Sequence, residues 1–209
     1  MDKYITVLET SSGEYSEKRS KFIAALVPCL SEAEAGEIIA GIKSKYFDAR
    51  HNVYAYILKN GSKKFSDDGE PHGTAGKPVL DILQGSNIVD AVLVVTRYFG
   101  GVLLGTGGLV RAYSAAAREA IENAEKVEMC PSDILSVECD YTYYQKLLSL
   151  VSLSGGIVED NVFADKVKLF IRIKEEDSRK FRENLTETFA SKLVAKEEKN
   201  GFFPYNLKK

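Results

Sequence analysis

The chain has 209 residues, of which 44% are hydrophobic and 28% charged, and its formal net charge at pH 7 is −2. This composition is typical of a globular protein with a buried core and excludes a disordered chain. It also excludes a global positive field that would recruit polyanions, so nucleic-acid binding would require a local basic patch.

The start of the chain lacks the apolar stretch of a signal peptide. The longest aliphatic run, about Ala91–Val95, is far shorter than the roughly 20 residues of a membrane span. The three cysteines, Cys29, Cys130 and Cys139, form no CxxC pair, which indicates neither a disulfide framework nor a zinc site. We therefore expect a cytoplasmic protein with buried thiols and with no metal, cofactor or membrane contact.

Strand character appears first at Tyr4–Glu9 and Ser20–Val27. Ser31 and Glu34 then have the spacing of a capping box, in which a hydroxyl and a carboxylate satisfy backbone amides at a helix start. The helix that follows carries its apolar residues on one face, at Ala35, Ile38, Ile39, Ile42 and Tyr46.

Further along, Asn52–Leu58 is rich in β formers, and Ala91–Tyr98 is apolar on both faces, as in a central strand. Between them we expect a polar, glycine-bearing loop and a short helical stretch around Pro78–Leu83. A glycine-rich turn then leads into an alanine-rich helix, about Gly108–Ala124.

The pattern breaks around Met129–Asp133, where we place the boundary between a first domain, 1–130, and a second, 131–209. The second domain shows the order β-α-β-β-α-β, which suits a ferredoxin-like sandwich and makes the whole chain α+β. Its strands are expected at Ile134–Asp140, Ile157–Phe163, Val167–Ile173 and Leu193–Glu198. We expect Gly201–Lys209 to be a mobile tail that its aromatic residues could hold against the domain.

The segment Asp67–Pro78 holds three carboxylates, one of the two histidines, a lysine and three glycines in twelve residues. Its glycines and prolines could present Asp68, Glu70 and His72 together, for a hard cation or for acid–base chemistry. One alternative is a structural loop whose Asp and Thr side chains bond to their own backbone. The other is a loop that forms the rim of a binding site, through Asp67, Asp68, Glu70, His72 and Thr74.

The segment Arg97–Tyr113 places five glycines in nine residues between a strand and a helix. Unobstructed amides at a helix N terminus bind anions, and guanidinium groups pair with phosphate. The segment matches neither a Walker A loop nor the βαβ setting of a dinucleotide site. The alternative is tight packing of the helix against the sheet. The predicted anion or nucleic-acid site consists of Lys77, Arg97, Gly105, Thr106, Gly107, Gly108 and Arg111.

Two basic clusters, Lys18–Lys21 and Lys63–Lys64, are interpreted as solvated faces unless they gather near this site, where they would form the required local patch. His51 has no neighbouring nucleophile and is interpreted as structural. Tyr98 and Phe99 are interpreted as core or hairpin residues.

Asp67–Pro78, Thr96–Gly101 and Leu104–Tyr113 closely resemble motifs of the YigZ/IMPACT family, and Ser20–Ala24 and His51–Tyr56 look like its upstream motifs. The resemblance covers about residues 15–125. It implies a first domain with the fold of the second domain of ribosomal protein S5 and a ferredoxin-like second domain similar to the last domain of elongation factor G. Eukaryotic members look like translation regulators with an extra N-terminal domain, and this chain is similar to the bacterial type.

We therefore predict a non-enzymatic regulator linked to translation that binds RNA, the ribosome or a translation-related protein through the Gly-rich, Arg-flanked edge of the first domain. The rival prediction is an enzyme acting on a nucleotide or small phosphorylated substrate, with Asp68, Glu70 or His72 as acid–base or metal-binding residues. A third is a protein-interaction module, which an exposed apolar patch beside the motif would indicate. The oligomeric state is left open.

Overall fold

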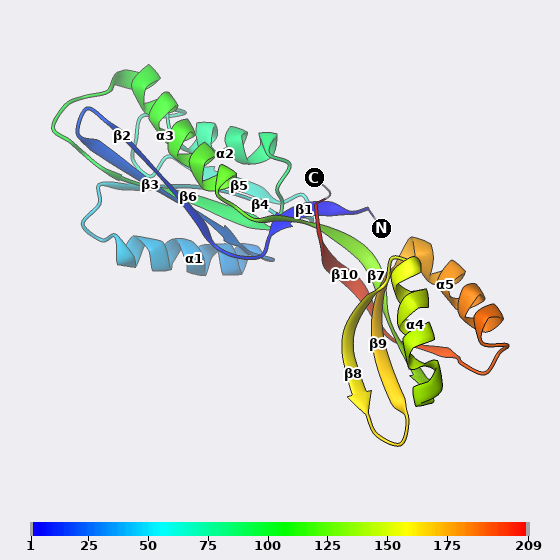
Figure 1. Cartoon of the computed structure of the whole chain (residues 1–209). Helices are drawn as coiled ribbons and strands as arrows, with labels where there is room; N and C mark the ends of the chain where they lie inside the picture. The colour runs from blue at the N-terminus through cyan, green and yellow to red at the C-terminus, as the bar shows by residue number, and fades with distance from the viewer. Residues whose placement is uncertain (1, 208–209) are drawn as a thin grey trace. The chain divides into compact units, whose positions relative to one another are not determined.

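The computed structural model describes residues 2–207. It divides into two compact units, one made mainly of Tyr4–Glu128 and the other mainly of Met129–Tyr205 (Figure 1). Each unit combines an antiparallel sheet with helices, so the chain has the predicted two-domain α+β organisation. No helix within the described residues has the length and apolarity needed to cross a bilayer.

The N-terminal unit is a sheet of order β2-β3-β6-β4-β5 with helices on both faces. The strands of this sheet are β2 (Ser11–Glu17), β3 (Ser20–Pro28), β4 (His51–Ile57), β5 (Lys63–Ser66) and β6 (Ala91–Tyr98). The strand β1 (Tyr4–Val7) belongs to this unit but not to this sheet. Its helices are α1 (Glu32–Lys45), α2 (Gly76–Gly85) and α3 (Gly105–Glu122). Figure 1 shows α1 on one face of the sheet and α2 with α3 on the other.

The central strand β6 is buried on both faces, as predicted, because it contributes to two apolar clusters. Leu93 and Val95 pack in the cluster under α2 and α3, and Val92 and Val94 pack in the cluster under α1. At the end of β6, Arg97 pairs with Phe22 of β3 and His51 of β4. The register therefore brings three side chains from distant parts of the sequence into one row.

Two edge strands, β2 and β5, were not predicted because neither carries an alternating apolar pattern. In β2 the buried position is Gly13, against which the α3 backbone lies so closely that a Cβ would be 2.4 Å from the Ala120 nitrogen. Helix α3 also begins three residues earlier than predicted, so Gly105–Gly108 form its first turn instead of a loop before it.

The C-terminal unit has the predicted β-α-β-β-α-β order. In its sheet β9 lies between β7 and β8 and is antiparallel to both, and β10 and β1 also pair with β7. The four strands of this unit thus have the ferredoxin-like arrangement. Its elements are β7 (Lys126–Cys139), α4 (Tyr141–Leu153), β8 (Ile157–Phe163), β9 (Val167–Lys174), α5 (Glu175–Thr188) and β10 (Ala195–Asn206). In β9 every second side chain points into the core beneath the two helices. These side chains are Val167, Leu169, Ile171 and Ile173.

Two features of this unit differ from what the sequence pattern indicated. Met129–Asp133 does not break the pattern but lies within the 14-residue strand β7, so both the predicted boundary after Cys130 and the division after Glu128 fall inside this strand. Most of the predicted mobile tail belongs to β10, which continues to Asn206 and is held by a contact of 3.0 Å between the Tyr205 and Ser132 hydroxyls. Lys208 and Lys209 lie outside the described residues.

Candidate functional site

Glu70 is a buried carboxylate that accepts hydrogen bonds from two elements. It is 8% exposed, and its Oε1 accepts from Arg97 Nη1 on β6 at 2.6 Å and from the Tyr113 hydroxyl on α3 at 2.7 Å. His51 Nε2 on β4 lies 3.8 Å from the same oxygen. A buried carboxylate needs such hydrogen-bond donors and positive partners, because burying an unpaired charge costs a large amount of free energy. Burial, and then the bond to Glu70, raise the pKa of Tyr113 well above its ordinary value.

Asp67 organises the backbone of the acidic loop. Its carboxylate accepts from the amides of Gly73 at 2.9 Å, Ala75 at 3.1 Å and Gly76 at 2.8 Å. Burial alone would raise the pKa of Asp67, but these amide donors outweigh it and hold the pKa below its ordinary value. Within the same loop, the Thr74 hydroxyl donates to the Pro71 carbonyl at 2.7 Å. These bonds match the structural-loop interpretation.

Asp68 also bonds to neighbouring parts of the fold. Its carboxylate pairs with Lys43 Nζ at 2.6 Å and accepts from the main-chain N–H of Asn52 at 2.7 Å. His51 Nδ1 lies 2.8 Å from the Asp68 carbonyl oxygen, which only accepts, so Nδ1 carries the proton and Nε2 faces Glu70. His72 is exposed and does not line the cleft described below. Asp68, Glu70 and His72 therefore do not converge on one point.

A cleft of about 490 Å³ opens above Glu70. Its floor is formed by Glu70, Arg97 and His51. Its walls are mainly apolar, and the N terminus of α3 closes one side. The other lining residues are Arg50, Pro71, Phe99, Leu103, Leu104, Gly105, Thr106 and Leu109.

The N terminus of α3 presents main-chain donors to this cleft. The first amides of a helix have no carbonyl one turn before them. Among residues 2–207 no side chain caps this helix, and its first turn contains no acidic residue. Gly105, Thr106 and Gly107 are exposed, whereas Gly108 is buried against Leu104. Gly105 has φ +73°, a conformation that favours glycine.

Arg97 is placed differently from an ordinary surface phosphate ligand. The residue is 5% exposed, and its guanidinium lies 5.5 Å from the ring centroid of Phe22 and 5.6 Å from that of Phe99. Its Nη1 is committed to Glu70, but its Nε is buried without an acceptor among the described residues. Arg97 therefore keeps one donor at the floor of the cleft that the described residues leave unpaired.

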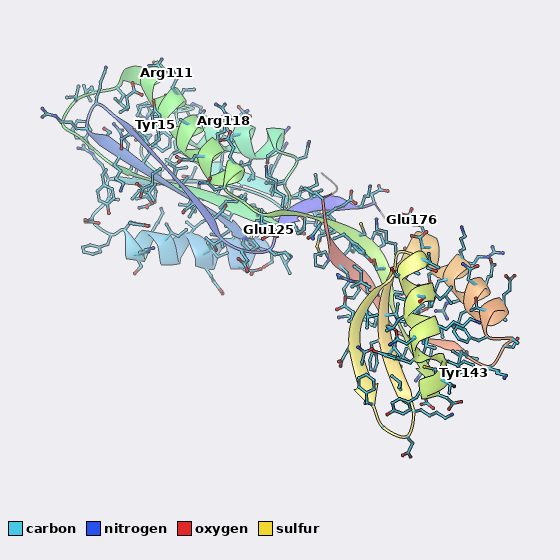
Figure 2. All side chains as sticks on the ribbon, in the orientation of Figure 1. Tyr15, Arg111, Arg118, Glu125, Tyr143 and Glu176 are labelled. Atoms are coloured by element: carbon cyan, nitrogen blue, oxygen red, sulfur yellow. The ribbon has the colours of Figure 1, made fainter. Side chains whose placement is uncertain are left out.

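Exposed basic residues lie on segments next to the cleft, and we call Lys18, Arg19, Arg50 and Arg111 the basic rim. Arg50 lines the cleft itself. Arg50 lies over the Phe99 ring at 5.6 Å. The Lys18–Arg19 hairpin tip packs so closely on Gly100 that a Cβ there would be 2.1 Å from the Arg19 carbonyl carbon. Arg111 is 71% exposed at the side chain, with a long contact of 3.8 Å to Glu17. Figure 2 shows it at the N-terminal end of α3, with Arg118 further along the helix.

Some predicted site residues lie elsewhere. Lys77 is exposed and pairs with Asp81 one turn along α2, and it does not line the cleft. Lys63 and Lys64 occupy the opposite end of the sheet, because Lys63 pairs with Ile57 and Ile57 pairs with Ala91 at the far end of β6. Of the two basic clusters, only the one containing Lys18 and Arg19 reaches the site.

Several cleft residues were not predicted to belong to a site. His51 and Phe99 were interpreted as structural, and Arg50 and Leu103 were not considered. The one available signal is the antiparallel pairing that puts His51 opposite Arg97. This signal could not be used without knowing the strand order. Within residues 2–207, no group of three or more His, Cys, Asp or Glu side chains is arranged to hold a metal ion.

Comparison with known proteins identifies the family. Residues 18–121 match the Impact N-terminal domain, and residues 137–192 match a domain of unknown function, DUF1949. Over 199 residues, the chain is 35% identical to IMPACT family member YvyE of Bacillus subtilis, covering 94% of this chain and 92% of the relative. The chain belongs to the IMPACT family.

Further relatives agree with the assignment to the IMPACT family. IMPACT family member YigZ of Escherichia coli is 36% identical over 143 residues, covering 66% of this chain and 70% of the relative. Protein IMPACT homolog of Dictyostelium discoideum is 40% identical over 96 residues, covering 43% of this chain and 27% of the relative. A crystal structure described as that of a hypothetical protein superposes with a TM-score of 0.62 at 28% identity, covering 95% of this chain and 98% of the other.

Proposed function

We propose that this IMPACT family member is a non-enzymatic, translation-associated protein that binds single-stranded RNA through the basic rim and the cleft next to it. The link to translation comes from the family, and the RNA surface is argued from the site. The observation that carries the proposal is that four exposed basic residues lie on segments that contact the β6–α3 loop or belong to α3, in a chain of net charge −2.

The chemistry of this edge suits a single strand. Phosphate groups are neutralised by exposed lysine and arginine side chains and by helix N-terminal amides. Unpaired bases stack on aromatic rings, and Phe99 is 38% exposed beside Arg50. The enzyme alternative has less support, because Asp67 and Asp68 are engaged by the loop and its neighbours, Glu70 is paired with Arg97, and His72 lies outside the cleft.

The test is binding of a fluorescently labelled single-stranded RNA, followed by anisotropy. We expect Arg19→Asn/Arg111→Gln to weaken binding by about tenfold or more, because two phosphate contacts are removed. Asparagine is chosen at position 19 because Arg19 has φ +67°. The control, Lys63→Gln/Lys64→Gln, removes the same charge at the opposite end of the sheet and should bind as the wild type does. Equal weakening in both variants would contradict the proposal.

A second candidate function, docking of a translation-related protein, is favoured by one observation. Leu103, which lines the cleft, is 82% exposed and the adjacent Val102 is 44% exposed, so the loop offers apolar surface of the kind that a protein-interaction module requires. Co-sedimentation with ribosomes separates the two functions. If a protein contact dominates, Leu103→Ser weakens co-sedimentation while Arg19→Asn/Arg111→Gln has no effect. Leu153→Ser, at a leucine 87% exposed on α4, is the matched control.

A further inference from the structure

We infer that the cleft beneath the basic rim is a pocket for one nucleoside monophosphate unit, with its phosphate at the N terminus of α3 and its base against Phe99. This inference rests on the proposed function, because it names the ligand class of the same site. It goes beyond a general attraction of the rim for polyanions, since it requires a specific fit inside the cleft.

The phosphate end of the pocket has donors of two independent kinds. Gly105 and Thr106 line the cleft at the uncapped start of an 18-residue helix, where main-chain amides favour an anion. Arg97 lines the same cleft, is 5% exposed, and has a buried Nε without an acceptor among the described residues. Buried donors are normally satisfied, so this nitrogen lacks an acceptor that a water or a ligand oxygen would supply.

The carboxylate on the floor does not exclude an anion. Glu70 Oε1 already accepts from Arg97 at 2.6 Å and from Tyr113 at 2.7 Å, so its charge is compensated within the protein. The positive charges of Arg50 and Arg111 are less fully compensated by contacts within the protein. Arg50 lies over the Phe99 ring, and the contact of Arg111 with Glu17 is 3.8 Å long. These positive charges near the cleft favour a negatively charged ligand.

The rest of the lining explains why the ligand should carry a base. Phe99, Leu103, Leu104 and Leu109 make most of the wall apolar, which suits a flat ring and does not suit a bare sugar phosphate. Phe99 is 38% exposed, and the guanidinium groups of Arg50 and Arg97 each lie 5.6 Å from its ring centroid, so a base would stack on a surface made of the ring and these groups. A volume of about 490 Å³ lies within the usual range for small-ligand pockets.

The experiment is calorimetric titration of the full chain with AMP, adenosine and inorganic phosphate. We expect AMP to bind more tightly than either of the other two. Thr106→Asp places a negative charge at the second residue of α3 and should weaken AMP binding by about tenfold or more, although aspartate there suits the helix. The matched control is Thr142→Asp, at the exposed second residue of α4, which should leave AMP binding unchanged. Phe99→Leu should weaken AMP but not inorganic phosphate.

A nucleotide unit could come from a free nucleotide or from an RNA end. Comparing free AMP with one RNA oligomer, bearing either a 5′-phosphate or a 5′-hydroxyl, separates these sources. Preference for the phosphorylated oligomer assigns the pocket to an RNA end, and preference for AMP assigns it to a free nucleotide.

The inference is overturned if AMP does not bind at millimolar concentration, or if Thr106→Asp and Thr142→Asp affect it equally. RNA binding that still depends on Arg19 and Arg111 would then leave the proposed function standing. The converse result, AMP binding without RNA binding, would reject the proposed function and retain the pocket.

Discussion

Glu70 and Arg97 form the buried pair on which the floor of the cleft depends, with side chains 3% and 6% exposed. Removing one member leaves the other as an uncompensated buried charge. We expect Arg97→Met to lower the free energy of unfolding by about 3–5 kcal/mol. The double variant Glu70→Gln/Arg97→Met should be clearly more stable than Arg97→Met alone. Urea unfolding of the single and double variants measures the coupling, and additive losses would contradict this account of the floor.

Asp67 makes a pH-dependent contribution to stability. Its pKa in the folded protein lies below the ordinary value of 3.8, so its stabilising effect is complete above that value and disappears as the pH falls through the folded pKa. We expect the wild type to exceed Asp67→Asn in free energy of unfolding near neutral pH. The difference in free energy of unfolding between the two proteins should narrow as the pH falls. A difference that widened in acid would contradict the lowered pKa of Asp67. Denaturant unfolding of both proteins from about pH 6 to about pH 3 provides the comparison.

The loop after β6 depends on a close approach between two elements. A Cβ on Gly100 would lie 2.1 Å from the Arg19 carbonyl carbon and 2.3 Å from the Ser20 nitrogen. We therefore expect Gly100→Ala to displace the β2–β3 hairpin tip and to lower the melting temperature. Gly36→Ala, within α1 where nothing lies within 4 Å, should instead stabilise by about 0.5–1 kcal/mol. Thermal unfolding measures both, and a harmless Gly100→Ala would contradict the packing described.

Central strands and helices with a strong apolar periodicity were predictable from the sequence, whereas the edge strands of the sheet were not. Strand β6 has an unbroken apolar run, and α1 has both a cap and an apolar stripe. Strand β2 is polar because it lies at an edge and buries a glycine instead of a large side chain. The candidate anion segment was found from its glycines, but the cleft was not, because its floor depends on the pairing of His51 with Arg97 across strands.

At the scale of the whole molecule, the net charge of −2 means that any strong salt dependence must arise from a local surface. For single-stranded RNA, the logarithm of the binding constant falls with the logarithm of salt concentration by about 0.7 per phosphate contact. We expect Arg19→Asn/Arg111→Gln to reduce the slope by about 1.4, corresponding to two contacts. Anisotropy titrations at several salt concentrations give the slope, and an unchanged slope would show that these arginines contact no phosphate.

The central claim is that RNA meets the N-terminal unit where α3 begins. Hydrogen–deuterium exchange of the full chain, with and without saturating single-stranded RNA, tests it directly because the proposed donors include the amides of Gly105, Thr106 and Gly107. We predict slower exchange in peptides that cover residues 99–108 and 18–21, and no change in those that cover Lys63 and Lys64. Slower exchange confined to residues 129–205, with the α3 N terminus unaffected, would contradict the claim.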